Sequence, residues 1–327
     1  MKENKITNQL KDKAIWLVLV ILVIAFTIAN ERFINPNNIL TLLRQVSMYG
    51  IASIGMTFVI LLGDIDLSTG TVISFVNILC AHMMVNMGMN PVIAVLISLV
   101  ASTLIGVLNG FMVSTVGIPA IIATYATQTA FMGLALIMCG GMPISGFSKG
   151  FAMIGQGYVG VVPIPVIIMA ICFAIGSFIL NKTYFGRYFY AVGGNVEAAR
   201  LSGILVNRIK YLVFAISGFF AGLAGIVMLS RTNSGNTSSG ADGFEFEVIT
   251  CVVLGGVSIT GGKGRMDGVA IGALIMSVIT YFISMIPGMS VWQKSLQGGI
   301  IIVAVAINYF TEQSAKRQAL KERSALI

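Results

Sequence analysis

Long apolar stretches separated by short polar connections make up most of this chain, and this alternation restricts it to folds that lie in a membrane. Of its 327 residues, 57% are hydrophobic and only 10% are charged, whereas soluble domains carry roughly a quarter charged residues. A helix needs about 20 apolar residues to cross a bilayer. The sequence therefore predicts an all-α integral membrane protein with about ten transmembrane helices, at residues 14–29, 40–62, 68–86, 91–110, 118–139, 162–180, 210–229, 246–260, 268–287 and 291–310.

The polar residues left over are too few for a second folded domain. We expect a cytoplasmic N-terminal segment at 1–13, a polytopic transmembrane domain at 14–310 and a basic cytoplasmic tail at 311–327. Because no polar segment reaches ordinary domain size, a soluble catalytic domain is excluded, and any energy-transducing domain must lie on another chain. The Lys-rich start resembles a signal peptide, but no small-residue cleavage pattern follows, so the first apolar stretch is predicted to be retained.

The basic residues indicate the orientation of the helices. The net charge is +8, and Lys and Arg accumulate in cytoplasmic loops. Such residues gather in the tail and in the loop between the sixth and seventh stretches, which favours two cytoplasmic termini; Arg32, Arg44, Lys149 and Arg231 run against this majority. Because the charge follows loops and not one folded face, we expect contact with membrane lipid and no nucleic acid.

Glycines interrupt several of the apolar stretches. Gly218, Gly222 and Gly225 are spaced to let two helix backbones approach closely. The stretch at 40–62 contains Gly50 and Gly55, and broken helices are common in transporters. We therefore predict close packing at the first set of glycines and a broken helix at the second.

The loop at 181–209 contains the pattern of a short helix over residues 195–203. Asn195 is a suitable N-cap, Glu197 lies in the first turn where the helix dipole favours an anion, and Gly203 suits a left-handed C-cap. A helix of about eight residues is marginal alone in water. Its small side chains, Ala198 and Ala199, favour insertion into a groove of a partner protein over burial in lipid.

Polar side chains within the apolar stretches are candidates for a solute pathway. They are Asn77, Thr124, Thr127 and Gln128. An unpaired amide in a membrane is costly, so these side chains either line a pathway or bond one helix to another. The centres of the stretches contain no ionisable residue, which favours external energy input and an uncharged, polyhydroxy solute.

Asp64 and Asp66 form a D-x-D pair just before the third stretch. Such a pair can bind a divalent metal ion. It can also form a turn, with Asp66 and Ser68 capping the helix that follows. We favour the turn and expect no metal, because neither a His nor a further acidic cluster accompanies the pair. The four cysteines likewise lack the spacing of a zinc or redox motif.

Four motifs carry a resemblance to a known family. They are "GDIDLSTGT" from Gly63, "GVLNGFMVSTVGIPAIIATYATQTAFMGLALIMCGGMPI" from Gly106, "AVGGNVEAARLSGI" at 191–204 and "EFEVITCVVLGGVSITGGKG" from Glu245. In this order they resemble the permeases of the ribose, galactose and xylose branch of ABC importers. The match departs from the family pattern at Ala120, Tyr125, Glu247 and Asn308.

The resemblance implies a function for the chain as a whole. It would be the permease subunit of a binding-protein-dependent importer for a small sugar or sugar-like solute. The chain itself would be non-catalytic and would bind no cofactor. Its partners would be an ABC ATPase that holds ATP and Mg²⁺, a periplasmic or lipid-anchored binding protein, and a second permease copy, identical or related, in a bacterial inner membrane. The ATPase coupling loop would comprise Asn195, Glu197, Ala198, Ala199, Arg200 and Gly203.

Two other classes of function remain open from the sequence. An ion-coupled secondary carrier would work without the 181–209 loop, and it would normally place ionisable residues within the spans. A membrane enzyme acting on lipid-linked sugars would use Asp64 and Asp66, and replacing either aspartate with Asn would then abolish turnover.

Overall fold

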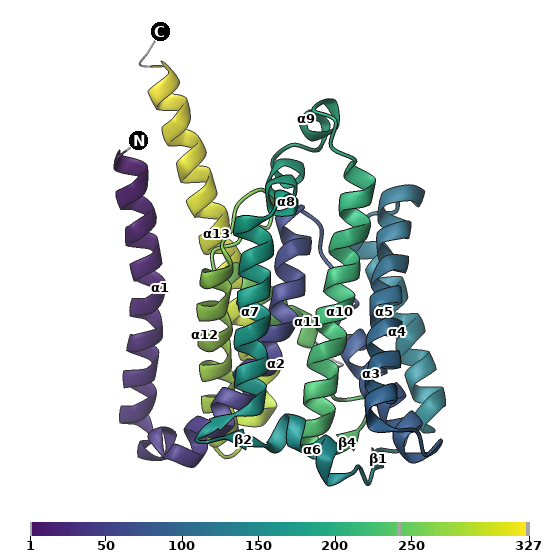
Figure 1. Cartoon of the computed structure of the whole chain (residues 1–327). Helices are drawn as coiled ribbons and strands as arrows, with labels where there is room; N and C mark the ends of the chain where they lie inside the picture. The colour runs from purple at the N-terminus through teal and green to yellow at the C-terminus, as the bar shows by residue number, and fades with distance from the viewer. Residues whose placement is uncertain (1, 241–242, 325–327) are drawn as a thin grey trace.

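The computed structural model describes residues 2–240 and 243–324, and among these it leaves undescribed the side chains of 2–14, 290–291, 307–308, 310–312 and 314–324. The molecule is a bundle of long helices that run roughly along one axis (Figure 1). The helices are α1 (Lys2–Ala29), α2 (Pro36–Leu61), α3 (Thr69–Val85), α4 (Pro91–Phe111), α5 (Ala120–Cys139), α6 (Lys149–Gln156), α7 (Ile164–Lys182), α8 (Tyr184–Gly194), α9 (Val196–Leu201), α10 (Val206–Thr232), α11 (Phe244–Leu254), α12 (Met266–Met285) and α13 (Gln293–Ser324).

Short elements connect the helices. The 3₁₀ turns η1 (Glu31–Ile34) and η3 (Met289–Trp292) precede α2 and α13, and the π-helical turn η2 (Met112–Val116) extends α4. Strand β1 (Ile144–Ser145) pairs antiparallel with β4 (Ser234–Gly235), and β2 (Tyr158–Val159) pairs antiparallel with β3 (Val162–Pro163). Both two-stranded sheets lie at the end of the bundle opposite α9 (Figure 1).

Most of the predicted spans are apolar helices in the structure. Within the described residues, six helices are long and apolar enough to cross a membrane: α2, α4 with η2, α5, α7, α10 and α12. Shorter apolar helical segments lie at Ile15–Ala29, Thr69–Val85 and Gln293–Ala306. The chain is therefore a nearly all-α, multi-pass membrane protein.

The prediction of a full span at 246–260 is wrong. The helix there, α11, has 11 residues, which at 1.5 Å per residue makes it about 16 Å long, roughly half of a bilayer core. The apolar sequence continues past its end, but the chain turns at Gly256, whose φ is +82°. Glycine adopts such angles without steric cost, so the helix ends inside an apolar run.

The prediction that the 40–62 stretch forms a broken helix is also wrong, because α2 is continuous from Pro36 to Leu61. Its glycines make room for neighbouring helices. A Cβ at Gly55 would lie 2.8 Å from the Ser217 Cα of α10, and one at Gly50 would lie 2.6 Å from the Met169 sulfur of α7. Glycine within α2 thus permits close approach of neighbours.

The close approach predicted at Gly218, Gly222 and Gly225 is confirmed. A Cβ on Gly218 would lie 3.1 Å from the Gly106 Cα of α4, and a Cβ on Gly225 would lie 2.8 Å from the Ile73 carbonyl oxygen of α3. Gly222 similarly faces the Ser102 side chain of α4. These contacts make α10 the best-packed helix in the centre of the bundle.

The packing contains an internal repeat. Helix α10 packs on α3 and α4, and α2 packs correspondingly on α11 and α12. The two central helices also pack on each other, while α5 contacts α3 as α13 contacts α11. The two four-helix units of the repeat are α2 to α5 and α10 to α13. Helix α2 begins at the end near η1 and α10 begins at the opposite end, near α9 (Figure 1), so the two units have inverted orientations. Inverted repeats are typical of transporters.

The two ends of the bundle differ in what they carry. Helices α8 and α9, the first turn of α1 and the last turns of α13 lie at one end (Figure 1). Helix α6 and the two short sheets lie at the other (Figure 1). The predicted placement of both termini on the side of the 181–209 loop is compatible with this arrangement.

Candidate solute pathway and coupling helix

Asp66 lies at the centre of a buried polar network between α3, α4, α5 and α10. Its side chain is 2% exposed. The Ser68 backbone N–H and hydroxyl donate to Asp66 Oδ1, and the Ser217 hydroxyl donates to Asp66 Oδ2 at 2.8 Å. The amide of Asn109 donates to Ser68 Oγ at 2.8 Å and accepts from Thr127 Oγ1 at 2.6 Å. One hydrogen-bond network therefore links four helices to the Asp66 carboxylate, directly through Ser68 and Ser217 and indirectly through Asn109 and Thr127.

This network fits the predicted turn better than the predicted cap. Asp66 and Ser68 form the expected side-chain-to-backbone bond of an Asx turn. Ser68 occupies the N-cap position of α3, but its side chain makes no cap hydrogen bond because its hydroxyl is bonded to Asp66. Asn109 and Ser217 escaped the sequence analysis, since nothing local connects them to residue 66.

Asp64 has a different partner from Asp66. Its carboxylate forms an ion pair with Lys210, with 2.8 Å between Asp64 Oδ2 and Lys210 Nζ, and both side chains are largely buried. Lys210 lies in the second turn of α10, just after the connection from α9. The two aspartates therefore bond to different groups, Asp64 to the start of α10 and Asp66 to the hydroxyls of Ser68 and Ser217.

The four candidate pathway residues all occupy contacts between helices or loops. Thr124 Oγ1 accepts from the Leu67 N–H at 3.0 Å, and Asn77 Oδ1 accepts from the Asn236 N–H at 3.1 Å. Gln128 Nε2 donates to Glu245 Oε1 at 3.2 Å. Asn77, Thr124 and Thr127 are buried, whereas Gln128 is half-buried. Their role in a solute pathway stays a prediction.

Glu245 is the main residue that the sequence analysis missed. It lies in the first turn of α11, is 4% exposed, and its Oε2 is 2.6 Å from where a Cβ on Gly70 of α3 would lie. The first turns of α3 and α11 thus converge on one carboxylate, where helix dipoles favour negative charge. Broken or short helices whose N-termini meet inside the bundle are a recurrent feature of transporter binding sites.

The bundle interior contains ionisable side chains, although the centres of the predicted apolar stretches contain none. Asp66 and Glu245 are both buried, and Glu247 is half-buried beside the Tyr49 phenol. In the sequence, Asp66 and Glu245 lie just before the third and eighth apolar stretches, and Glu247 lies at the start of the eighth. In the structure, α3 and α11 begin inside the bundle, so residues next to their starts are interior residues.

The predicted short helix in the 181–209 loop is confirmed as α9. Asn195 Oδ1 accepts from the Ala198 N–H at 2.9 Å, and Gly203 has a φ of +83° beyond the C-terminal end. Glu197 forms an exposed ion pair with Arg200 at 2.9 Å. The sequence analysis did not resolve α8, the helix that leads into α9.

Helix α9 presents an uncovered surface at the end of the molecule. Ala198 is exposed while Ala199 is buried against the protein, so the helix has an inner and an outer face. Leu201 is 89% exposed and Leu205 follows the helix at 59%. Two exposed leucines therefore lie at the outer end of α9 and just after it.

The family departures lie in several environments. Ala120 is buried at the start of α5, and Tyr125 on the same helix is exposed. Glu247 lies beside Tyr49, as described above. The side chains of Asn308 and of the basic tail lie outside the described residues, although the α13 backbone continues to Ser324.

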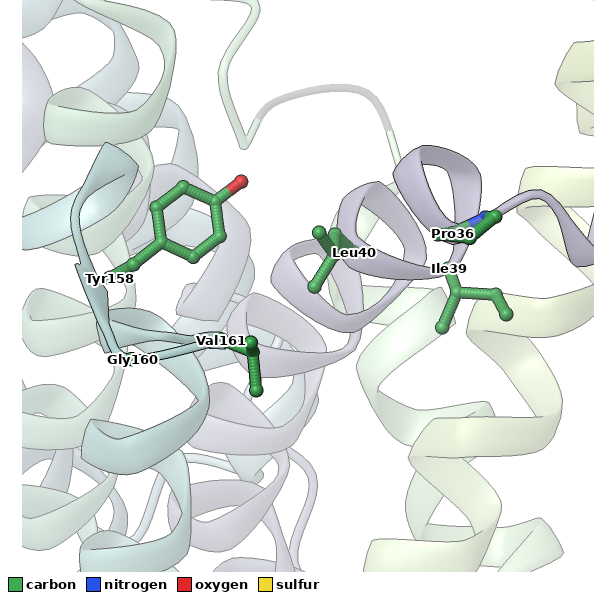
Figure 2. Close-up of a pocket in the computed structure, with 6 residues that line it drawn as sticks. All are labelled: Pro36, Ile39, Leu40, Tyr158, Gly160 and Val161. Carbon is green, nitrogen blue, oxygen red and sulfur yellow. The ribbon is translucent and has the colours of Figure 1, made fainter.

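A separate apolar groove lies at the end opposite α9. Pro36, Ile39 and Leu40 of α2 form one wall, and Tyr158, Gly160 and Val161 of the β2–β3 hairpin form the other (Figure 2). Its volume is about 570 Å³. The Arg44 guanidinium lies 4.6 Å from the Tyr158 ring centroid. The groove contains none of the candidate pathway residues.

Comparison with known proteins defines the class of this chain. Residues 38–305 match the family described as "Branched-chain amino acid transport system / permease component", so the chain belongs to that family. No solved structure matches the chain.

Among relatives, the ribose import permease protein of Bacillus subtilis (strain 168) is 40% identical over 295 residues, covering 90% of this chain and 91% of the relative. The ribose import permease protein of Haemophilus influenzae is 41% identical, covering 90% and 92%. The xylose transport system permease protein of Haemophilus influenzae is 30% identical, covering 90% and 95%.

Proposed function

We propose that this chain is the membrane-spanning permease subunit of an ATP-driven, binding-protein-dependent importer for a small sugar of the ribose type. The observation that carries the proposal is the near full-length relation, at 40 and 41% identity, to two ribose import permeases. The family description names branched-chain amino acids, but the relatives at this identity are named for sugars.

The same relation supports a proposed subunit composition. The chain pairs with a second permease copy in a bacterial inner membrane, with about ten membrane segments and both termini in the cytoplasm. A binding protein docks at the end that carries α6 and the two short sheets. An ATPase subunit holds ATP and Mg²⁺ and docks at the end that carries α9. The chain itself catalyses no reaction.

The exposed face of α9 supports the position of the ATPase. Its side chains from 197 to 201 face away from the bundle, except for Ala199. A short capped helix that exposes Ala198 and Leu201 beside the Glu197–Arg200 ion pair fits a groove in a soluble partner. Closure of the ATPase pair then moves α9, and this movement alternately opens the pathway to the two sides of the membrane.

Buried polar groups support the sugar class of solute. Amides, hydroxyls and carboxylates recognise polyhydroxy compounds through hydrogen bonds, and Gln128 is the one predicted pathway residue that is half-exposed. It is held by Glu245 on α11. We place the solute next to Gln128, where the first turns of α3 and α11 meet.

The docking surface is tested by co-purification of the chain with its ATPase. Glu197→Lys and Ala198→Arg change the exposed face of α9, and both are expected to reduce the bound ATPase at least about tenfold. Lys149→Glu, an exposed charge reversal at the opposite end on α6, is the matched control and retains the ATPase. Retention of the ATPase by both α9 variants, at the level of the control, would contradict the proposal.

A further inference from the structure

Three backbone segments meet at the end of α8, next to the start of α9. They come from the end of α8, from the loop after α2 and from the loop between α11 and α12. The Gly262 N–H donates to the Leu61 carbonyl oxygen at 2.9 Å. Gly193 of α8 lies against this hydrogen bond, and Gly63 and Gly261 lie beside it. We call Leu61, Gly63, Gly193, Gly261 and Gly262 the glycine junction.

The junction has no room for side chains. A Cβ at Gly193 would overlap the Leu61 carbonyl oxygen and lie 2.6 Å from the Gly262 nitrogen. A Cβ at Gly261 would lie 2.8 Å from the Gly63 nitrogen and 2.9 Å from the Gly193 carbonyl oxygen. Gly63, Gly261 and Gly262 also have φ values of +81°, +84° and +70°, which other residues rarely adopt. Backbone therefore meets backbone, without a compressible side chain between.

Tyr190 adds a second bond between the same parts. It lies one turn before the end of α8, and its hydroxyl donates to the Gly264 carbonyl oxygen at 2.7 Å. Burial raises the pKa of the Tyr190 phenol, so the hydroxyl stays protonated and able to donate at neutral pH. Helix α8 is thus bonded to the 255–265 loop as well as packed on it.

The junction connects α9 to both units of the internal repeat. Only Gly194 separates Gly193 from Asn195, the N-cap of α9. The loop after Leu61 carries Asp64 and Asp66 and leads into α3. The loop through Gly262 joins α11, which carries Glu245, to α12. One small region therefore contacts the connections to both short helices that meet near Gln128.

We propose that the glycine junction transmits the movement of α9 to α3 and α11 together. A rigid backbone contact passes on a displacement that a flexible side chain would absorb. The inference rests on the proposed function, because it needs an ATPase to move α9. It identifies Gly193 and Tyr190 as positioning residues that act through the two loops and not through contact with solute.

The test uses the whole importer, reconstituted with its ATPase and binding protein. Hydrogen–deuterium exchange of loops 62–68 and 255–265 is compared before and after trapping with ATP and vanadate, and uptake of radiolabelled D-ribose is measured per ATP hydrolysed. Gly193→Ala is expected to keep the ATPase bound but to abolish the exchange change in both loops and to lower uptake per ATP about tenfold.

Two further variants complete the design. Gly194→Ala is the matched control, since a Cβ there meets nothing within 4 Å, and it is expected to behave as wild type. Tyr190→Phe removes one hydrogen bond and adds no volume, so it is expected to halve the exchange response of loop 255–265. It carries the test alone if Gly193→Ala fails to assemble. Wild-type responses in both Gly193→Ala and Tyr190→Phe, or in Tyr190→Phe alone when the other is unfolded, overturn the inference. A wild-type chain that binds no ATPase overturns the proposed function, and the inference with it.

Discussion

Individual buried polar residues here mainly form hydrogen bonds between segments that are distant in the sequence. Asp66 and Ser217 are 151 positions apart in the chain, and Gln128 and Glu245 are 117 apart. In a bundle whose helices are apolar nearly all round, such bonds fix which faces meet. A carboxylate held by hydroxyls and a backbone N–H is also more stable inside protein than an isolated charge would be.

Removing the central carboxylate should loosen the bundle. Asp66→Ala leaves the hydroxyls of Ser68 and Ser217 without their acceptor, so we expect a loss of about 2–4 kcal/mol in unfolding free energy. Ser217→Ala removes one of the three bonds to Asp66 and should cost about 1 kcal/mol. Thermal unfolding of the purified protein measures both. Equal, negligible shifts would show that the network contributes nothing to stability.

Predictions from single residues succeeded where the determining bonds were local. The cap at Asn195, the turn at Asp66 and the left-handed Gly203 depend on neighbours within a few positions. Asn109, Ser217 and Glu245 were missed because the bonds that connect them to Ser68, Asp66 and Gln128 span 41, 151 and 117 residues. No short sequence pattern states which distant hydroxyl will face a given amide.

Helices in this molecule meet closely wherever glycine faces a neighbouring backbone. Gly106 of α4 lies against the Phe214 carbonyl and is 3.1 Å, measured from its would-be Cβ, from the Ala215 Cα of α10. Such contacts replace the hydrophobic driving force that is absent between helices in lipid. Within the long helices, glycine is therefore a packing residue and not a helix breaker.

Substitution at this contact should be costly. Gly106→Ala forces α4 and α10 apart, and we expect a loss of about 1–3 kcal/mol in unfolding free energy. Gly133→Ala on α5 is the control, because a Cβ there meets nothing within 4 Å; it should gain about 0.5–1 kcal/mol through better helix propensity. Thermal unfolding of both variants decides the point, and shifts of the same sign and size would refute the packing argument.

Helix boundaries were predicted well where polarity changes with structure. The lengths of α4, α5, α7 and α12 follow their apolar runs to within a few residues. The end of α11 was mispredicted because the sequence stays apolar past Leu254 while the backbone turns. Composition reports what a segment is buried in, and it says little about where a helix stops inside that environment.

On the scale of the whole molecule, the two inverted units, α2 to α5 and α10 to α13, pack on each other through their first helices, α2 and α10. Each unit contributes one short helix, α3 or α11, whose first turn lies inside the bundle. Beneath α9 the backbone connections of both units meet at the glycine junction. Through these connections, a displacement of α9 at one end of the molecule reaches both units, as proposed above.

The secondary-carrier and enzyme alternatives predict different behaviour of the whole molecule. A secondary carrier transports without an ATPase, and the buried carboxylates make an ion-coupled mechanism chemically possible. An enzyme that uses Asp64 and Asp66 needs both carboxylates at one substrate, whereas they bond to Lys210 and to Ser68 with Ser217. Transport that depends on ATP separates the importer from both.

The most direct measurement is uptake of radiolabelled D-ribose into liposomes that contain the chain, its ATPase and its binding protein. The account predicts uptake of D-ribose only when ATP and Mg²⁺ are on the ATPase side and all three proteins are present. Radiolabelled leucine, the amino-acid control, is predicted not to be taken up. Uptake by the chain alone, driven by an ion gradient and indifferent to ATP, would contradict the account and identify a secondary carrier.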